Sequence, residues 1–228
     1  MSSQIAQRII EEIGSGVYLP GATLPSEQHL ATTYGVSRPI VREAFKLLSA
    51  QGFLSVTTGK SAIIREVNDE LLRVFMRRVL SSGSSTSIQD LFAVRIILEE
   101  MSAALAARNR TKKDLQQLGA ALTEMKRYID EPAFYSEFDI KFHVLLAQSS
   151  RNIFLFHLIS SIRETLVSLG SKMRSNLSTA EIAQIHHHHI SIYKAVEKGD
   201  SAEAVASMEL HFETVPSRLK KYLKILRA

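Results

Sequence analysis

Asp139 and His143 lie four residues apart in the segment Phe138-Asp-Ile-Lys-Phe-His143, so a helix would place both side chains on one face. A carboxylate and an imidazole in that arrangement can bind one divalent ion from a single rigid helix. The same spacing is more often a surface ion pair. The two residues alone therefore leave both roles open.

More imidazoles follow in the last third of the chain, where His186 to His189 are consecutive and His211 comes later. Both positions fall near the middles of predicted helices. The run is internal and follows a helix-capping residue, which argues against a purification tag, and only one or two of its four members can face inward. The chain has no cysteine, so a thiolate site is impossible and any metal must be held by histidines and carboxylates.

A second set of candidates is basic. Arg38 and Arg42 share one face of a predicted helix whose opposite face is apolar. Guanidinium groups at the N-terminal end of such a helix can bind guanine edges or phosphates. The alternative is that they pair with Glu43 or with acidic groups of the first helix. Lys60, taken alone, is equally consistent with a solvated surface lysine.

The elements around these arginines favour DNA binding. Apolar residues at helical spacing predict a helix over 4–14, and Ser26 is suited to cap a second helix that runs to about Thr33. Gly35 then makes a tight turn before Ser37, which we expect to cap a third helix. Two β-rich runs, 53–57 and 62–65, bracket a glycine turn and predict a hairpin. Two short helices meeting at a glycine, followed by a hairpin, indicate a winged helix-turn-helix.

This region closely resembles the winged-helix signature of GntR-family regulators. The resemblance covers most of residues 5–65 and rests on Pro20-Gly-Ala-Thr-Leu-Pro-Ser-Glu27, Leu30-Ala31, Gly35-Val-Ser-Arg38, Val41-Arg-Glu-Ala44 and Leu47-Leu48. It implies a homodimer on a palindromic operator in double-stranded DNA, with recognition helices in the major groove and wing tips toward the minor groove. By position, the DNA contacts would come from Ser37, Arg38, Arg42, Thr58, Gly59 and Lys60.

One residue departs from that signature. The family often has arginine directly after the Pro-Ser-Glu triplet, and this chain has Gln28. We expect Gln28 to contribute less to DNA affinity, and with less dependence on salt, than an arginine would. The formal net charge of +5 is only a weak sign of a polyanionic partner, because many enzymes have a similar charge.

From about residue 70 the pattern is helical throughout. Polar breaks at 81–87, 109–111, 130–132, 149–152, 170–178 and 199–201 predict about seven helices, and Pro216 should kink or end the last one. Thr111 with Asp114 and Ser178 with Glu181 have the spacing of capping boxes. The chain contains no run of about 18 apolar residues and no signal-peptide pattern at its start. We therefore expect a soluble, cytoplasmic protein with no membrane partner.

The order of the metal-type residues resembles the metal-binding form of the FCD domain, the effector domain of the FadR subfamily. Arg95 with Glu99, and His189-Ile-Ser-Ile192 leading to Gly199-Asp200, extend the resemblance over roughly residues 70–215. It implies that the ligands of a divalent transition metal, zinc before nickel or manganese, are Asp139, His143, His189 and His211.

The resemblance also implies an effector, a small organic or sugar acid held between the metal and a polar side chain. Arg95 and Asn152 are the effector-binding candidates, and a purely structural pair of Arg95 with Glu99 is an equal alternative. Arg151 stands where the family usually has a glycine before the asparagine, which could add a second cation at the pocket.

Taken together, the sequence predicts a mainly α protein with a winged helix-turn-helix DNA-binding domain over 1–67 and an all-helical effector-binding and dimerisation domain over 68–228. The predicted function is a ligand-responsive transcription regulator, a repressor. A metal-ion sensor and a metalloenzyme with an accessory DNA-binding domain are the alternatives. An enzyme is disfavoured because the site has no general base apart from its expected ligands, and we assign no catalytic residues.

Overall fold

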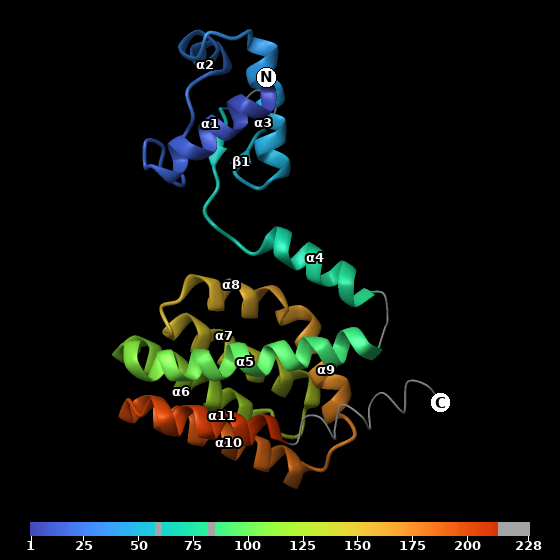
Figure 1. The fold of residues 1–228 in the computed structure, drawn as a ribbon. Helices are drawn as coiled ribbons and strands as arrows, with labels where there is room; N and C mark the ends of the chain where they lie inside the picture. The colour runs from blue at the N-terminus through green and yellow to red at the C-terminus, as the bar shows by residue number, and fades with distance from the viewer. Residues whose placement is uncertain (58–60, 82–84, 214–228) are drawn as a thin grey trace. The chain divides into compact units, whose positions relative to one another are not determined.

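The structure is a computed structural model that describes residues 1–57, 61–81 and 85–213 (Figure 1). The chain divides into two compact units, Met1–Leu71 and Leu72 onward, where the sequence predicted a boundary after residue 67. Over the described residues the elements are α1 (Ser2–Gly14), α2 (Glu27–Tyr34), α3 (Arg38–Ala50), β1 (Leu54–Ser55), β2 (Ile63–Ile64), α4 (Glu70–Ser81), α5 (Ser85–Asn109), α6 (Lys112–Arg127), α7 (Pro132–Ser149), α8 (Ile153–Ser161), α9 (Arg163–Arg174), α10 (Thr179–Lys198) and α11 (Ser201–Glu213).

The first unit contains the predicted helix-turn-helix. The Ser26 hydroxyl accepts a hydrogen bond from the backbone N–H of His29 at the start of α2, and Gly35 ends α2 with a left-handed φ of 65°. Ser37 occupies the capping position of α3, but its side chain makes no capping hydrogen bond, contrary to our expectation. Its hydroxyl is exposed instead. The turn geometry thus comes from Gly35 and the α2 cap.

A small core holds this unit together. Ile9 of α1 and Val41 and Leu48 of α3 are fully buried where the two helices pack. The hairpin is antiparallel, with Leu54 opposite Ile64, and both of these side chains are buried against the same core. The strands are shorter than the two predicted runs. The expected wing-tip residues 58–60 lie outside the described residues.

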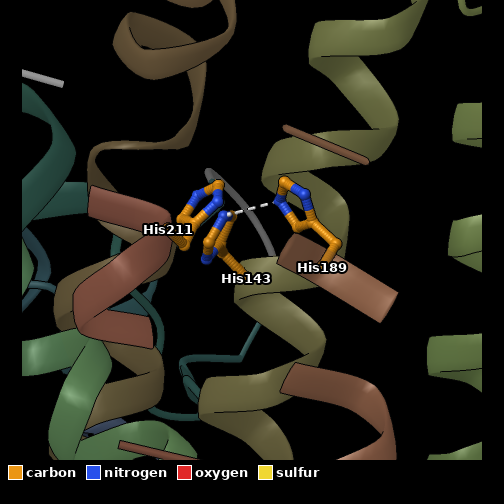
Figure 2. A group of neighbouring side chains, drawn as sticks. All are labelled: His143, His189 and His211. Carbon is orange, nitrogen blue, oxygen red and sulfur yellow. Dashed lines mark hydrogen bonds between the residues drawn. The ribbon is translucent and has the colours of Figure 1, made fainter. Parts of the chain in front are cut away.

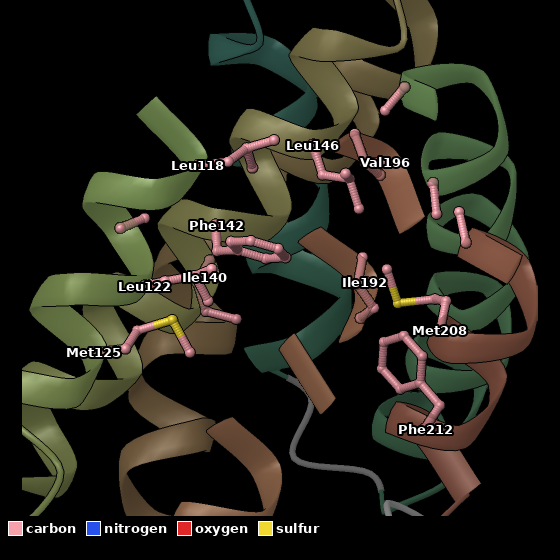
Figure 3. Packing of buried hydrophobic residues seen from close by; sticks show 14 of the residues in the cluster. Leu118, Leu122, Met125, Ile140, Phe142, Leu146, Ile192, Val196, Met208 and Phe212 are labelled. Atoms are coloured by element: carbon pink, nitrogen blue, oxygen red, sulfur yellow. The ribbon is translucent and has the colours of Figure 1, made fainter. Parts of the chain in front are cut away.

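The second unit is a helical bundle with α7 inside it. This helix packs against α5, α6, α8 and α9, while α10 and α11 pack against each other and against α5. Because helices surround α7, it is buried on several sides. The core beside it draws side chains from α5, α6, α7, α9, α10 and α11, including Leu118, Met125, Phe142, Leu146, Ile192, Met208 and Phe212 (Figure 3). On the side of α7 that faces the bundle, Asp139 and His143 lie in the interior, each 1% exposed.

The described residues of this unit include eight helices rather than about seven. The extra break separates α8 from α9 at Ile162, where the sequence has no glycine or proline and where no side chain makes a capping hydrogen bond to α9. Both predicted capping boxes are present, at Thr111 with Asp114 and at Ser178 with Glu181. The predicted serine-rich linker is in part helical, because α5 begins at Ser85. Pro216 lies outside the described residues.

Across the described residues, no single helix is both long and apolar enough to cross a membrane. Only α8 and α9 taken together reach that length and composition, and they are bent by 52° at the break between them.

Candidate metal centre and DNA-binding surface

Three of the four expected metal ligands meet inside the second unit. His143 of α7, His189 of α10 and His211 of α11 are buried, and each offers a ring nitrogen that lies within 4.8 Å of the others (Figure 2). The Nε2 atoms of His143 and His189 are 3.2 Å apart. The burial of α7 thus excludes the surface ion pair that was the alternative for His143.

The outer nitrogens of two of these rings are already committed as donors. His189 Nδ1 donates to the carbonyl of Ile185 at 2.8 Å, and His143 Nδ1 contacts the carboxylate of Glu99, which can only accept. With the ring proton of each histidine on Nδ1, the two Nε2 atoms would present lone pairs to each other. Two lone pairs at 3.2 Å repel unless a cation lies between them, and this arrangement is the one that metal-binding histidines adopt.

The charge states suit a cation. Burial lowers the pKa of His143, although Glu99 opposes the effect, and burial holds the pKa of His211 well below its usual value, so these rings are neutral at pH 7. Burial alone would raise the pKa of the Asp139 carboxyl. The Arg174 guanidinium and the nearby His189 outweigh burial and hold that pKa well below its usual value. Asp139 is therefore an anion beside neutral imidazoles.

Asp139 lies next to the three histidines but is bound elsewhere as well. Its Oδ1 is 3.1 Å from His189 Nε2 and 2.6 Å from Arg174 Nη2. The sequence pattern did not single out Arg174, because the predicted break over 170–178 removed it from any helix. In the structure Arg174 lies in the last turn of α9.

A partly open pocket with a cavity volume of about 40 Å³ adjoins this cluster. Its polar wall contains Arg95, Asp139, Arg174 and His211, and Phe92 and Phe212 belong to its apolar wall. Two cationic side chains, an anionic side chain and a candidate metal ligand thus face one enclosed space.

Arg95 fits both roles that the sequence left open. It is buried, its Nε donates to the Glu99 carboxylate, and it lines the pocket. Its guanidinium also lies 5.7 Å from the ring centre of Phe92 and 5.1 Å from that of Phe212. Burial raises the pKa of Glu99, but the Arg95 charge and the hydrogen bonds from His143 and Arg95 outweigh it and lower that pKa, so the carboxylate stays ionised.

Asn152 is not among the residues that line this pocket. Its side chain accepts hydrogen bonds from the backbone N–H groups of Phe154 and Leu155, which caps α8, and it borders a separate shallow hollow. Its expected role in effector binding gains no support from this placement.

Arg151 does not supply the second cation of the pocket, contrary to our expectation. It has a left-handed φ of 58°, a conformation that glycine adopts without strain. Its guanidinium binds Asp114 and the carbonyl of Gln148. The second cation beside Arg95 is Arg174.

The histidine run is buried more extensively than predicted. His186, His188 and His189 are all buried, whereas His187 is exposed. Only His189 belongs to the group that could hold a metal. Burial and the neighbouring His189 lower the pKa of His186 to about 4.

In the first unit, the two arginines of α3 remain exposed and share one partner. Arg38 Nε lies 2.9 Å and Arg42 Nη2 lies 3.0 Å from the carboxylate of Glu27 at the start of α2. Hydrogen bonding to Arg42 is the main cause of the lowered pKa of Glu27. Glu43, the partner considered from sequence, binds Lys46 instead. About half of each arginine side chain is accessible, as a nucleic-acid contact requires.

A helix-turn-helix that presents two arginines, followed by a helical domain with an enclosed polar pocket, defines a ligand-binding transcription regulator. The family model for bacterial regulatory proteins of the gntR family matches residues 1–64, and the model for the FCD domain matches residues 90–214. The chain belongs to the GntR family of bacterial transcription regulators and carries an FCD domain, so it is a regulator and not an enzyme.

Individual relatives agree with this assignment along nearly the whole chain. The HTH-type transcriptional regulator LutR of Bacillus subtilis (strain 168) is 30% identical over 93% of this chain and 98% of its own. The galactonate operon transcriptional repressor of Escherichia coli (strain K12) is 28% identical over 86% of this chain and 87% of its own. The solved structure of Streptococcus agalactiae GntR is 26% identical, covers 94% of this chain and 98% of its own, and superimposes with a TM-score of 0.70.

Proposed function

We propose that this regulator is a homodimeric repressor that binds a palindromic operator and releases it when a small organic or sugar acid binds beside a divalent metal ion in the FCD domain. The observation that carries the proposal is the meeting of His143, His189 and His211 beside a pocket lined by two arginines.

The donor set supports a metal of the zinc type, with nickel or manganese as alternatives. Two nitrogens that each lie about 2.1 Å from one tetrahedral ion are roughly 3.4 Å apart. The 3.2 Å between the Nε2 atoms of His143 and His189 agrees with that spacing. Glu99 and the carbonyl of Ile185 would keep both rings in the required tautomer. Asp139 would complete the set once it is released from Arg174.

The charge balance of the pocket supports an anionic effector. Arg95 and Arg174 are balanced by Glu99 and Asp139, and the neutral imidazoles add no charge. A bound divalent ion would add two positive charges and open coordination positions. An uncompensated charge in a buried site is costly, so a carboxylate should bind there favourably. One relative is named as the repressor of the galactonate operon, and galactonate is a sugar acid. That name is consistent with an acidic effector.

Metal and effector are tested in one experiment on the tag-free protein. Elemental analysis after zinc supplementation should give stoichiometric zinc, and His143→Ala should lose it. D-galactonate, acetate and other carboxylates should then raise the melting temperature of the zinc-loaded protein, because a ligand that binds the folded state stabilises it. Absence of a bound transition metal in the wild type would contradict the metal part. Stabilisation by no carboxylate would contradict the effector class.

The DNA-binding part is tested with an operator selected from a random duplex library. Arg38→Ala combined with Arg42→Ala should abolish selective binding, since each base contact of this kind contributes about 1–3 kcal/mol. Arg8→Ala is a matched control, because Arg8 lies on α1 and pairs with Glu12. Unchanged operator binding by the double variant would contradict the assignment. Operator release by zinc alone, with no effect of any acid, would identify a metal sensor instead.

A further inference from the structure

Because Gly170 has no side chain, the guanidinium of Arg174 can lie directly against this position of α9. A Cβ atom at this position would lie 2.5 Å from Arg174 Nη1 and 3.5 Å from Ser136 Oγ. A glycine in the middle of a helix is less favourable than an alanine. In return, Gly170 lets the side chain of Arg174, one turn later, lie flat across the helix and reach Asp139.

Few of the guanidinium N–H groups of Arg174 have a hydrogen-bond partner that holds the side chain in this position. Nη2 lies 2.6 Å from Asp139 Oδ1, and Nη1 donates to Ser136 Oγ at 3.0 Å. Its guanidinium also lies 5.2 Å from the ring centre of Tyr135. The Nε–H is buried and makes no hydrogen bond with any described residue. A buried guanidinium N–H without an acceptor is unfavourable, so Arg174 retains unused binding capacity at the wall of the pocket.

Arg174 and a metal ion would compete for the negative charge of Asp139. Asp139 is the only carboxylate among the proposed metal ligands, and its Oδ1 already serves Arg174. A divalent ion that takes this carboxylate deprives the guanidinium of its counter-charge and places a like charge beside it. A planar guanidinium so released is suited to bind a carboxylate through two parallel hydrogen bonds.

We propose that Arg174 exchanges partners: it pairs with Asp139 while the site is empty of ligands, and it binds the carboxylate of the effector once Asp139 binds the metal ion. This inference rests on the proposed function and adds a specificity-determining residue to it.

Arg95 is less suited to such an exchange. Its partner Glu99 also holds His143, so a movement of Arg95 would disturb a candidate ligand. Its guanidinium lies close to two aromatic rings as well. Arg174 contacts the site only through Asp139, and its side chain is 12% exposed at the pocket, against 6% for Arg95.

The exchange predicts opposite effects of one substitution on two ligands. Arg174→Gln removes the cation that competes for Asp139, so affinity for zinc alone, measured against a chelating dye, should rise roughly tenfold in carboxylate-free buffer. The same variant, loaded with zinc, should lose the rise in melting temperature that acetate and D-galactonate cause in the wild type. A purely structural role of Arg174 predicts that both effects weaken.

Two further variants control the result. Gly170→Ala changes no charge but fills the space of the guanidinium, so zinc affinity should rise and the response to carboxylates should fall, as in Arg174→Gln. This variant also serves if Arg174→Gln does not fold. Arg163→Gln removes an exposed arginine at the start of α9 that pairs with Glu137, and it should behave as wild type in both assays.

The outcomes separate the two proposals. A wild type that binds no zinc, or that binds zinc but responds to neither carboxylate, overturns the proposed function and this inference with it. A wild type that binds both ligands, with Arg174→Gln and Gly170→Ala indistinguishable from it or weaker for zinc, overturns the partner exchange alone.

Discussion

Glu27 binds both arginines that α3 presents, and it therefore controls how much positive charge this surface offers to DNA. Because these side chains are largely exposed, the ion pairs contribute little to stability. Their effect on DNA binding is larger, since a carboxylate beside two guanidiniums neutralises part of their attraction for phosphate and restricts their positions.

We predict that Glu27→Gln raises affinity for random-sequence duplex DNA several-fold and makes that affinity more salt-dependent, because two guanidiniums are released to bind phosphates. Selectivity for the operator over random DNA should fall. Fluorescence anisotropy over a range of salt concentrations measures both. Glu43→Gln is the control, because Glu43 contacts Lys46 and neither arginine. Equal behaviour of the two variants would argue against control by Glu27.

His186 makes stability depend on pH. Its pKa of about 4 in the folded chain lies below the value of about 6.5 in the unfolded chain, so below pH 6.5 protons bind preferentially to the unfolded state. The contribution is therefore fully present above pH 6.5 and is lost as the pH falls toward 4. We predict that the melting temperature of the metal-free protein falls over this window, and less so in His186→Asn. His187→Asn, at the exposed neighbour, should retain the wild-type dependence.

At the scale of single residues, the sequence was sufficient to predict those residues whose arrangement follows from their spacing along one helix. Arg38 and Arg42 share a face because they are four apart, and His143 follows Asp139 by the same rule. The meeting of His143 with His189 and His211 depends on how three helices pack, so it came only from a family resemblance. Arg174 was missed because Gly170 was interpreted as a helix breaker, whereas it lies inside α9 and accommodates a side chain.

Individual helices were predictable where their ends carry a chemical signal. Both capping boxes form as expected, because each needs only a hydroxyl and a carboxylate three residues apart. At the break between α8 and α9, Ser161 and Glu164 have the same spacing, but no capping hydrogen bond forms, because the Ser161 hydroxyl donates to the carbonyl of Leu158. The break occurs at Ile162, a buried apolar residue, so tertiary packing contributes to the position where α8 ends.

Asn152 caps α8 in the structure, whereas the sequence suggested that it binds the effector. Its side chain caps α8 by accepting two backbone N–H bonds. We predict that Asn152→Ala costs about 1 kcal/mol of unfolding free energy, equivalent to a melting temperature lower by about 3 °C. Because Asn152 does not line the pocket, zinc affinity and the response to carboxylates should not change.

The same thermal-shift series tests the effector role that the sequence suggested for Asn152. A variant with an unchanged melting temperature that no longer responds to carboxylates would restore Asn152 as an effector contact. Asn152→Asp is the matched control, because aspartate is an equally good capping residue.

At the scale of the whole molecule, the two units have separate hydrophobic cores. Multidomain proteins commonly depart from two-state unfolding. We predict two calorimetric transitions, of which only the one belonging to the unit from Leu72 onward rises when zinc and a carboxylate are added. In Leu48→Ala, which truncates a buried side chain of the first unit, the other transition should fall by itself. A single transition that both changes move would contradict independent unfolding.

The fold class was predictable at this scale because composition and periodicity change along the chain. β-rich runs occur only near residues 53–65, and the helical pattern is continuous thereafter. Apolar residues on most sides of α7 favour a buried helix, but this pattern does not show which side chains its polar residues meet there. The position of α7 inside the bundle converts Asp139 and His143 from an ordinary pair into an interior site.

The positive charges of two arginines at the pocket are balanced by two carboxylates. In the proposed function, this charge balance determines when the protein can respond to its effector. Without the ion the site has no net charge with which to attract an acid, and without the acid the charge of the ion has no counterpart. Each ligand thus strengthens the binding of the other by the same factor. If the proposed function holds, the regulator responds only when metal and acid are both present, and a cell short of metal would leave the target genes unresponsive at any concentration of the acid.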